Sequence, residues 1–231
     1  MSSLVRPAAL TPLYPISEAA RYARTRPQTL RRWAEGYEIE GRAYPPLLVI
    51  PDERPLGETA LSFENLIETA LITWWRRRGI SLQRIRRAHT LAMTEFGEHP
   101  FARREVYLAG MDLFIEADES TREEAGASFT VITGGGQRVL REPIQQYLRQ
   151  IDWRTGEATP YQWRPLEGAD IVKLNPEIEF GLPNVHRIRT EIILQRFMAR
   201  ESVGEIADDF GLIQGEVEQA LRYEWALSAA A

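Results

Sequence analysis

The pattern of apolar and polar residues first becomes helical near residue 16. Ile16, Ala19, Ala20 and Ala23 recur at the spacing of one helix face, and Ser17 is a residue type that favours the N-cap position. We therefore predict a short first helix that begins near Ser17. Residues 1–13 show no such period and are expected to form a loose tail.

A second short helix is predicted after the turn formed by residues 23–26. Pro27 suits the first helical position, because the N–H that proline lacks would be unpaired there, and Gly36 marks the end of the helix. The apolar residues of this segment share one helix face: Leu30, Trp33 and Ala34. Residues 38–50 form extended segments around a glycine turn, which predicts a β-hairpin, or wing.

Two longer helices are predicted between residues 62 and 96. The first follows Ser62 and is broken at Gly79, and the second follows Ser81, which is a favourable N-cap. Trp74 and Trp75 are adjacent, so at least one of them must leave the face that packs into the core. We interpret the exposed one as a candidate contact in a dimer.

The pattern changes between residues 106 and 174. Short apolar runs at 112–116, 128–132 and 170–174 predict strands, and the three glycines at 134–136 predict a turn. A helix is predicted at 143–150 and a hairpin at 153–166. Helical spacing returns at residues 187–226, where Ser202 and Glu205 form a capping-box pattern and Gly211 ends the second of three short helices.

The fold class that follows is mainly α with a small α+β middle. We divide the chain into a winged helix-turn-helix domain at residues 14–105, a middle region at 106–169 and a three-helix unit at 170–231.

Composition excludes several functional classes. The 231 residues include no cysteine and only three histidines, which are distant from one another in the sequence, so neither a metal site nor another cofactor is expected. No Ser/His/Asp grouping is visible, and we expect no catalytic residues. No apolar run has the roughly 18 residues of a membrane helix, and the N-terminus lacks the apolar core of a signal peptide. The expected location is the cytoplasm, without membrane contact.

Charge is distributed unevenly along the chain. The net charge is −5, yet residues 1–115 hold 16 basic and 13 acidic side chains, whereas residues 116–231 hold 12 and 20. Residues 21–32 contain five arginines and no acid, and residues 76–87 contain six more arginines without an acid, as phosphate neutralisation requires. The alternative is that these arginines form a solvated helix face. Residues 201–224 hold seven acids and one base, which disfavours phosphate binding there.

Two segments resemble known families. The run YPISEAARYARTRPQTLRRWAEGY, the following GRAY and the later RRGISLQRIRR resemble, over about residues 14–90, the winged helix-turn-helix of MerR-type regulators. This resemblance implies DNA contacts from the second helix and its preceding turn, with backbone contacts from the wing. Together with the charge pattern it gives this DNA-binding set: Arg24, Arg26, Gln28, Thr29, Arg31, Arg32, Arg42 and Tyr44.

The C-terminal segment from Asn175 to Trp225 resembles the homeodomain-like domain of VapB-type antitoxins. The matching features include Asn-Pro, Phe-Gly-x-Pro, the run SVGEIADDFGL and the closing Ala-Leu-Arg-Tyr-Glu, whereas His186 to Thr190 depart from the compact Gly-Thr-Arg turn of relatives. The resemblance implies an antitoxin that inhibits a PIN-domain ribonuclease toxin and represses its own operon. The candidate toxin-binding residues are Arg187, Arg189, Phe197, Arg200, Tyr223 and Trp225.

Two alternatives remain open at this point. One is a MerR-like one-component regulator whose middle region binds a small molecule, and the other is a protein-interaction adaptor without DNA binding. Whether the protein is an antitoxin or a one-component regulator, we expect a homodimer, because a two-fold dimer places two recognition helices about 34 Å apart on operator DNA. Tyr223 or Trp225 is expected to remain exposed for a partner, since three short helices cannot bury every aromatic residue.

Overall fold

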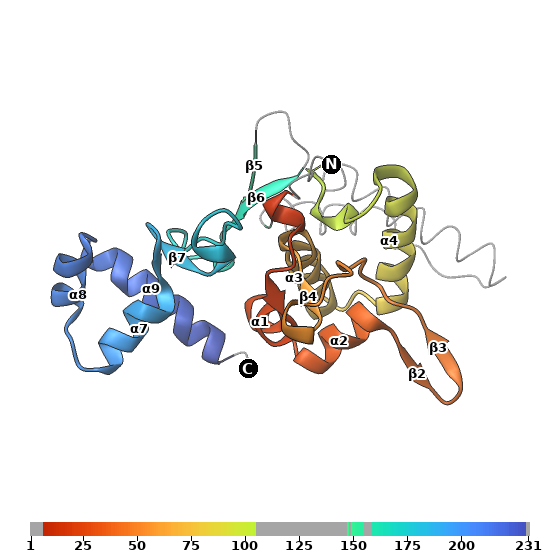
Figure 1. Ribbon diagram of the computed structural model, residues 1–231, viewed down its shortest axis with the longest axis horizontal. Helices are drawn as coiled ribbons and strands as arrows, with labels where there is room; N and C mark the ends of the chain where they lie inside the picture. The colour runs from red at the N-terminus through yellow and green to blue at the C-terminus, as the bar shows by residue number, and fades with distance from the viewer. Residues whose placement is uncertain (1–6, 105–146, 148, 155–158, 230–231) are drawn as a thin grey trace.

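The computed structural model describes residues 7–104, 147, 149–154 and 159–229. Helices α1–α4 lie on one side, helices α7–α9 lie on the other, and the β5–β6 hairpin lies between them (Figure 1). The described part is mainly helical, as the sequence predicts, and its strands form short antiparallel pairs. Among the described residues, none of the helices has the length and apolar character needed to span a membrane.

Helices α1 (Ile16–Tyr22) and α2 (Pro27–Glu35) form the first helix pair. Pro27 occupies the first turn of α2 as expected, but α1 begins at Ile16 rather than Ser17, because Pro15 is its N-cap. Residues 7–13 are not a loose tail: a 3₁₀ turn at Ala8–Leu10 packs on α3, and the Leu13 N–H donates to the Leu61 carbonyl at 3.0 Å. The sequence pattern missed this because one short turn has no detectable period.

The predicted wing is present as strands β2 (Tyr37–Ile39) and β3 (Arg42–Tyr44). The turn between them, Glu40 and Gly41, has positive φ at both residues, as a two-residue hairpin requires. A second short pair joins β1 (Tyr14–Pro15) to β4 (Ala60–Leu61) and fixes the start of α1 beside the start of α3. A 3₁₀ turn at Pro55–Gly57 lies in the connection before β4.

Helices α3 (Phe63–Arg77) and α4 (Leu82–Phe96) begin at the predicted serines. The hydroxyl of Ser62 accepts the Asn65 N–H in a capping box, and that of Ser81 accepts the Arg84 N–H. Nearly every residue of α3 is buried, so α3 is the central element of the N-terminal half. Trp75 is buried and Trp74 is half-buried, which confirms that the adjacent pair cannot share one environment.

Part of the middle region lies outside the described residues, including the predicted strands at 112–116 and 128–132, the glycine turn at 134–136 and most of the helix at 143–150. The hairpin is confirmed by β5 (Ile151–Trp153) and β6 (Pro160–Trp163). The strand predicted at 170–174 is wrong: this segment is a turn followed by single bridges, Leu174 to Trp163 and Lys173 to Asn184. Here the chain is irregular and packs Ala169, Val172 and Leu174 into the core, because burial of apolar side chains does not require a β-ladder.

The C-terminal part begins with a 3₁₀ turn at Glu179–Gly181 and the pair β7 (Asn184–Val185) and β8 (Ile188–Arg189). Helices α7 (Thr190–Met198), α8 (Val203–Phe210) and α9 (Gln214–Ser228) follow and pack on one another. The predicted capping box is present, since the Ser202 hydroxyl accepts the Glu205 N–H and the Glu205 carboxylate accepts the Ser202 N–H.

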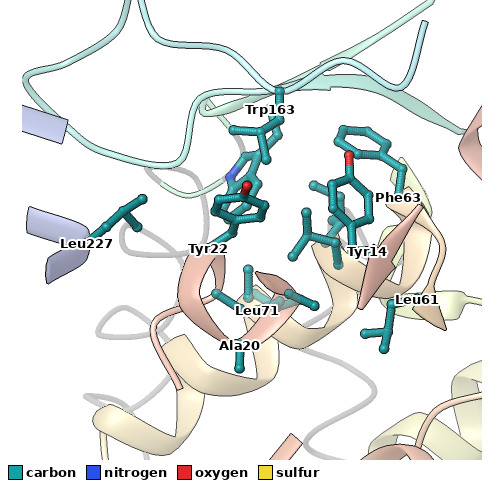
Figure 2. Close-up of a cluster of buried hydrophobic side chains, with 14 of the residues drawn as sticks. Tyr14, Ala20, Tyr22, Leu61, Phe63, Leu71, Trp163 and Leu227 are labelled. Atoms are coloured by element: carbon teal, nitrogen blue, oxygen red, sulfur yellow. The ribbon is translucent and has the colours of Figure 1, made fainter. Parts of the chain in front are cut away.

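One apolar core joins the two halves. Tyr14 and Tyr22 from the N-terminal half lie near Trp163 of β6 and Leu227 of α9, and all four side chains are buried (Figure 2). The Tyr14 hydroxyl donates to the Gly181 carbonyl at 3.0 Å, across 167 residues of sequence. The third predicted segment, from residue 170, therefore shares its core with the first.

A buried ionic cluster lies between α3 and α4. The carboxylate of Glu68, which is fully buried, accepts from His89 Nε2 at 3.2 Å, from His99 Nδ1 at 3.4 Å and from the Phe101 N–H at 3.1 Å. Burial favours a higher pKa for Glu68, but the hydrogen bonds from both histidines outweigh it and lower the pKa to about 2. Among the described residues, no group of three or more His, Cys, Asp or Glu side chains is placed so that it could hold a metal ion.

Candidate nucleic-acid interface and partner surface

Helix α2 separates its residues into a buried face and a polar face. Leu30, Trp33 and Ala34 are buried against the core. The opposite face presents the exposed side chains of Gln28, Arg31 and Arg32, and Arg26 is exposed at the N-cap. Thr29 is half-buried beside them. The structure therefore brings together five of the predicted DNA-binding residues on and just before one helix.

The start of α2 is electropositive. Its first turn holds no acidic residue, so the partial positive charge of the helix N-terminus adds to the charge of Arg26. Arg31 approaches Glu35 at 3.8 Å, but both side chains are largely exposed, and such a surface pair contributes at most about 0.5 kcal/mol. Glu35 also accepts from the Thr59 hydroxyl at 2.8 Å. Arg31 therefore remains available to a phosphate group.

Arginine and tyrosine side chains connect α2 to the wing. Tyr37 and Tyr44 stack at 4.7 Å between ring centroids, which fixes the base of the hairpin. The guanidinium of Arg32 lies 5.5 Å from the Tyr37 ring, and that of Arg42 lies 5.4 Å from the Tyr44 ring. These contacts place the charges of the helix and of the wing on one connected surface.

The junction between α2 and the wing requires glycine at position 36. Gly36 has a φ of +78°, and a Cβ at this position would lie 2.7 Å from the Tyr44 carbonyl oxygen. The junction is held from the other side by Arg86 of α4, whose Nη1 donates to the Pro45 carbonyl at 2.8 Å. The angle between helix and wing is therefore set by close backbone packing rather than by a flexible linker.

The structure separates Arg24 from the predicted DNA-binding set. Arg24 is half-buried at a positive φ, and its Nε and Nη2 atoms are buried in the wall of a cavity. Arg24 therefore does not share the exposed surface of α2, and its contact with DNA stays a prediction. Among the six arginines at 76–87, Arg77 and Arg86 bond distant segments: Arg77 donates to the Arg24 carbonyl, and Arg86 donates to the Pro45 carbonyl at the wing base.

The C-terminal part presents a second, apolar surface. Among the described residues, five of the six large apolar side chains that are exposed lie after residue 179: Phe180, Ile192, Met198, Ile213 and Trp225. Trp225 is 51% exposed and its ring meets Phe197 edge-on at 5.9 Å. Because single exposed apolar side chains are common on protein surfaces, the contacting pair of Trp225 and Phe197 is the best candidate for a surface covered by a partner.

The expectation that Tyr223 or Trp225 remains exposed is met by Trp225, whereas Tyr223, a candidate toxin-binding residue, is not at the surface. Its side chain is fully buried, because the inner face of α9 packs against the N-terminal half as well as against α7. Burial raises the pKa of Tyr223, and the nearby hydroxyl of Tyr22 raises it further. Trp225 is therefore the one of these two aromatics that remains available to a partner.

The predicted C-terminal arginines differ in their availability. Arg187 and Arg200 are exposed, and both have positive φ in tight turns before α7 and α8. Arg189 is half-buried, and its Nε donates to Glu179 Oε2 at 3.0 Å, so a partner would have to compete with that ion pair. Arg196, which the sequence did not single out, pairs with Glu201 and Asp209 and joins α7 to α8.

Comparisons with known proteins agree with the N-terminal geometry. Residues 12–89 match the family model described as "Putative DNA-binding HTH domain". The chain is 27% identical over 225 residues to the Mycobacterium tuberculosis protein named "Putative antitoxin VapB45", covering 91% of this chain and 92% of that protein. The fold is similar to the crystal structure of Rv2018 from Mycobacterium tuberculosis, with a TM-score of 0.71, 23% identity and coverage of 91% of this chain and 97% of that one. Residues 12–89 therefore form a helix-turn-helix domain, within a fold shared along most of the chain with the mycobacterial protein.

Proposed function

We propose that this protein is the antitoxin of a type II toxin–antitoxin system, which binds operator DNA through its N-terminal half and a PIN-domain ribonuclease toxin through its C-terminal part. The observation that carries the DNA-binding half is the acid-free N-terminus of α2, with Gln28, Arg31 and Arg32 exposed beside an arginine-bearing wing. The named relative supports the antitoxin assignment. In this proposal the protein is a regulator rather than an enzyme.

The proposed DNA complex follows the geometry of a MerR-like winged helix. Helix α2 enters the major groove, where Gln28 and Thr29 are close enough to the helix start to reach base edges. Arg26, Arg31 and Arg32 contact phosphates, and Arg42 and Tyr44 contact the backbone from the wing. We propose a homodimer that reads two half-sites and represses its own operon.

Replacing Arg31 and Arg32 together with alanine is expected to weaken binding to all DNA sequences about equally. Each lost phosphate contact reduces the slope of log K against log salt concentration by about 1, so the slope for the double variant should be smaller by about 2. Fluorescence anisotropy over a salt series with operator DNA and unrelated DNA measures both quantities. The matched control is Arg187→Ala with Arg200→Ala, which removes the same charge from exposed turns of the C-terminal part. An unaltered protein that binds no DNA at low salt would refute the DNA-binding proposal.

The proposed toxin surface combines an apolar centre with exposed arginines in a homeodomain-like three-helix unit. Trp225 and Phe197 supply the aromatic pair, and the acidic sequence from 201 to 224 disfavours nucleic acid as the partner. PIN-domain ribonucleases bind metal through a ring of carboxylates, and Arg187 and Arg200 are unpaired with carboxylates among the described residues. We propose that one of these two arginines reaches that ring and that Arg189 stays with Glu179.

Replacing Trp225 with alanine is expected to weaken the complex with the toxin by about 2 kcal/mol, or about thirtyfold in Kd. The measurement is calorimetry with an inactive form of the PIN-domain toxin that this proposal expects a neighbouring gene to encode. Ile39→Ala is the matched control, because Ile39 is also an exposed apolar residue but lies in the wing. Point variants are required, since removal of the chain from residue 170 would also remove Tyr223 and Leu227 from the shared core. An unchanged Kd for Trp225→Ala would contradict the assignment of this surface.

A further inference from the structure

A cavity of about 430 Å³ lies where the two halves of the protein meet. Its described lining comes from four places: the end of α1 and the following turn, the C-terminal half of α3, Tyr147 and Gln150 before β5, and the segment around β6. Figure 2 shows Tyr22 of α1 and Trp163 of β6, two residues of this lining, on the same side of the core. Neither the DNA-binding surface nor the apolar C-terminal surface uses this space.

The cavity is lined by three guanidinium groups and, among its described residues, one carboxylate, Glu167. Arg24 Nε and Nη2 are buried without a hydrogen-bond partner. Arg77 donates to the Arg24 carbonyl at 2.6 Å, and Arg78 lies 3.5 Å from the Trp74 ring centroid. Within the part of the chain that the structure describes, none of these three arginines forms an ion pair with a carboxylate. Burial lowers the pKa of Arg24, and the neighbouring charge of Arg77 lowers it further.

The rest of the lining is aromatic and contains unused donors. Trp74 and Tyr147 lie with ring centroids 6.1 Å apart, and Trp163 adds a third ring. Trp163 and Thr73 are only 2% and 6% exposed, and the buried atoms Trp163 Nε1 and Thr73 Oγ1 have no hydrogen-bond partner. Buried donors in native proteins almost always have partners, so a group of them around one cavity indicates a missing acceptor.

We propose that this cavity binds a small aromatic anion, whose carboxylate, sulfonate or phosphate lies among Arg24, Arg77 and Arg78 while its ring packs on Trp74 and Trp163. The acidic group would supply the acceptor that Arg24 lacks and would separate two like charges. The volume falls within the range of ordinary small-molecule sites. A positively charged ligand is disfavoured by the three guanidiniums.

The position of Arg24 links this site to the DNA-binding helix. Arg24 lies in the turn between α1 and α2, and its carbonyl is held by Arg77 from α3. A ligand that engages both arginines therefore fixes the turn that precedes Pro27. This consequence rests on the proposed DNA-binding function, whereas ligand binding itself does not.

The test uses 8-anilinonaphthalene-1-sulfonate with the full-length chain, and the neutral N-phenyl-1-naphthylamine as the matched probe without a charge. We expect saturable binding of one sulfonate probe per chain, weakened about tenfold by Arg24→Gln and by Arg78→Gln. Arg78→Gln leaves the bond between Arg77 and Arg24 intact. Arg76→Gln is the control, because Arg76 is exposed on the same helix and its Nη1 bonds the Ile80 carbonyl outside the cavity. The neutral probe should bind at least about tenfold more weakly.

Several outcomes would overturn the proposal. These are equal affinity for the two probes, equal affinity in the Arg24 and Arg76 variants, or no saturable binding. DNA titrations without a probe provide a further distinction. If Arg24→Gln reduces DNA affinity and its salt dependence as a phosphate contact does, Arg24 belongs to the DNA interface and the ligand site is refuted. If the unaltered protein binds the probe but no DNA, the cavity proposal stands and the DNA-binding proposal fails.

Discussion

Replacing Glu68 with glutamine is expected to lower the free energy of unfolding by about 3 to 5 kcal/mol, because it removes one partner of a buried ion pair. The carboxylate of Glu68 is fully buried and accepts from two histidines and one backbone N–H. Glutamine has nearly the same shape but no charge, so a protonated histidine would remain buried without compensation. Urea unfolding followed by circular dichroism measures the loss, which corresponds to a fall in Tm of about 10 °C.

Glu64 provides the control from the same helix. It is also buried, but its Oε2 has no hydrogen-bond partner, and burial raises its pKa. Glu64→Gln removes a charge that burial already disfavours, so we expect a change within about 1 kcal/mol. Equal losses at the two positions would show that any polar change inside α3 is destabilising and would refute a specific role for the Glu68 pair.

The loss caused by Glu68→Gln is expected to depend on pH. Burial lowers the pKa of His99, but its hydrogen bond to Glu68 and the charges of Glu68, Glu64 and Glu98 outweigh burial and raise the pKa above 6.5. Stabilisation through His99 is therefore complete below pH 6.5 and lost as the pH rises through the raised value. Stabilisation through Glu68 is complete above pH 4.5 and lost as the pH falls towards 2. The difference in the free energy of unfolding between the unaltered protein and Glu68→Gln should be largest between pH 4.5 and 6.5.

The N-terminal half was accessible to sequence reasoning because its signals are local. Pro27, Gly36, Ser62 and Ser81 occupy helix or turn positions whose backbone requirements are specific to a few residue types, and each has the predicted place in the structure. The capping box at Ser202 succeeded for the same reason. The partners of these residues lie three or four positions away along the chain, so the sequence itself shows them.

The errors concern contacts between distant parts of the chain. His89 on α4 and His99, just before the 3₁₀ turn at Pro100–Ala102, both contact Glu68, although nothing in the sequence indicates that these distant residues share a partner. The burial of Tyr223 depends on the packing of α9 on the N-terminal half, which the pattern of its own three helices does not show. The position of Arg24 depends on a positive φ for which arginine gives no sequence signal. In each case, the deciding partner lies outside the local window.

The same dependence on distant contacts makes Gly181 a critical position between the two halves. Gly181 has a φ of +78°, and a Cβ there would lie 2.1 Å from the Tyr14 hydroxyl oxygen. That hydroxyl donates to the Gly181 carbonyl, so backbone and side chain are in direct contact. Tyr14, the first residue of β1, is fully buried, so its ring cannot move away without disturbing the packed core.

Replacing Gly181 with alanine is therefore expected to lower the free energy of unfolding by about 3 kcal/mol or more, through the combined cost of a left-handed alanine and an overpacked contact. Gly211→Ala separates the two causes, because Gly211 also has a positive φ, +67°, but a Cβ there meets nothing within 4 Å. The control should lose about 1 kcal/mol, which is the cost of the backbone conformation alone. Urea unfolding of both variants measures the difference. If the two variants lose the same amount, the contact with Tyr14 is not what couples the halves, and the C-terminal part folds without support from β1.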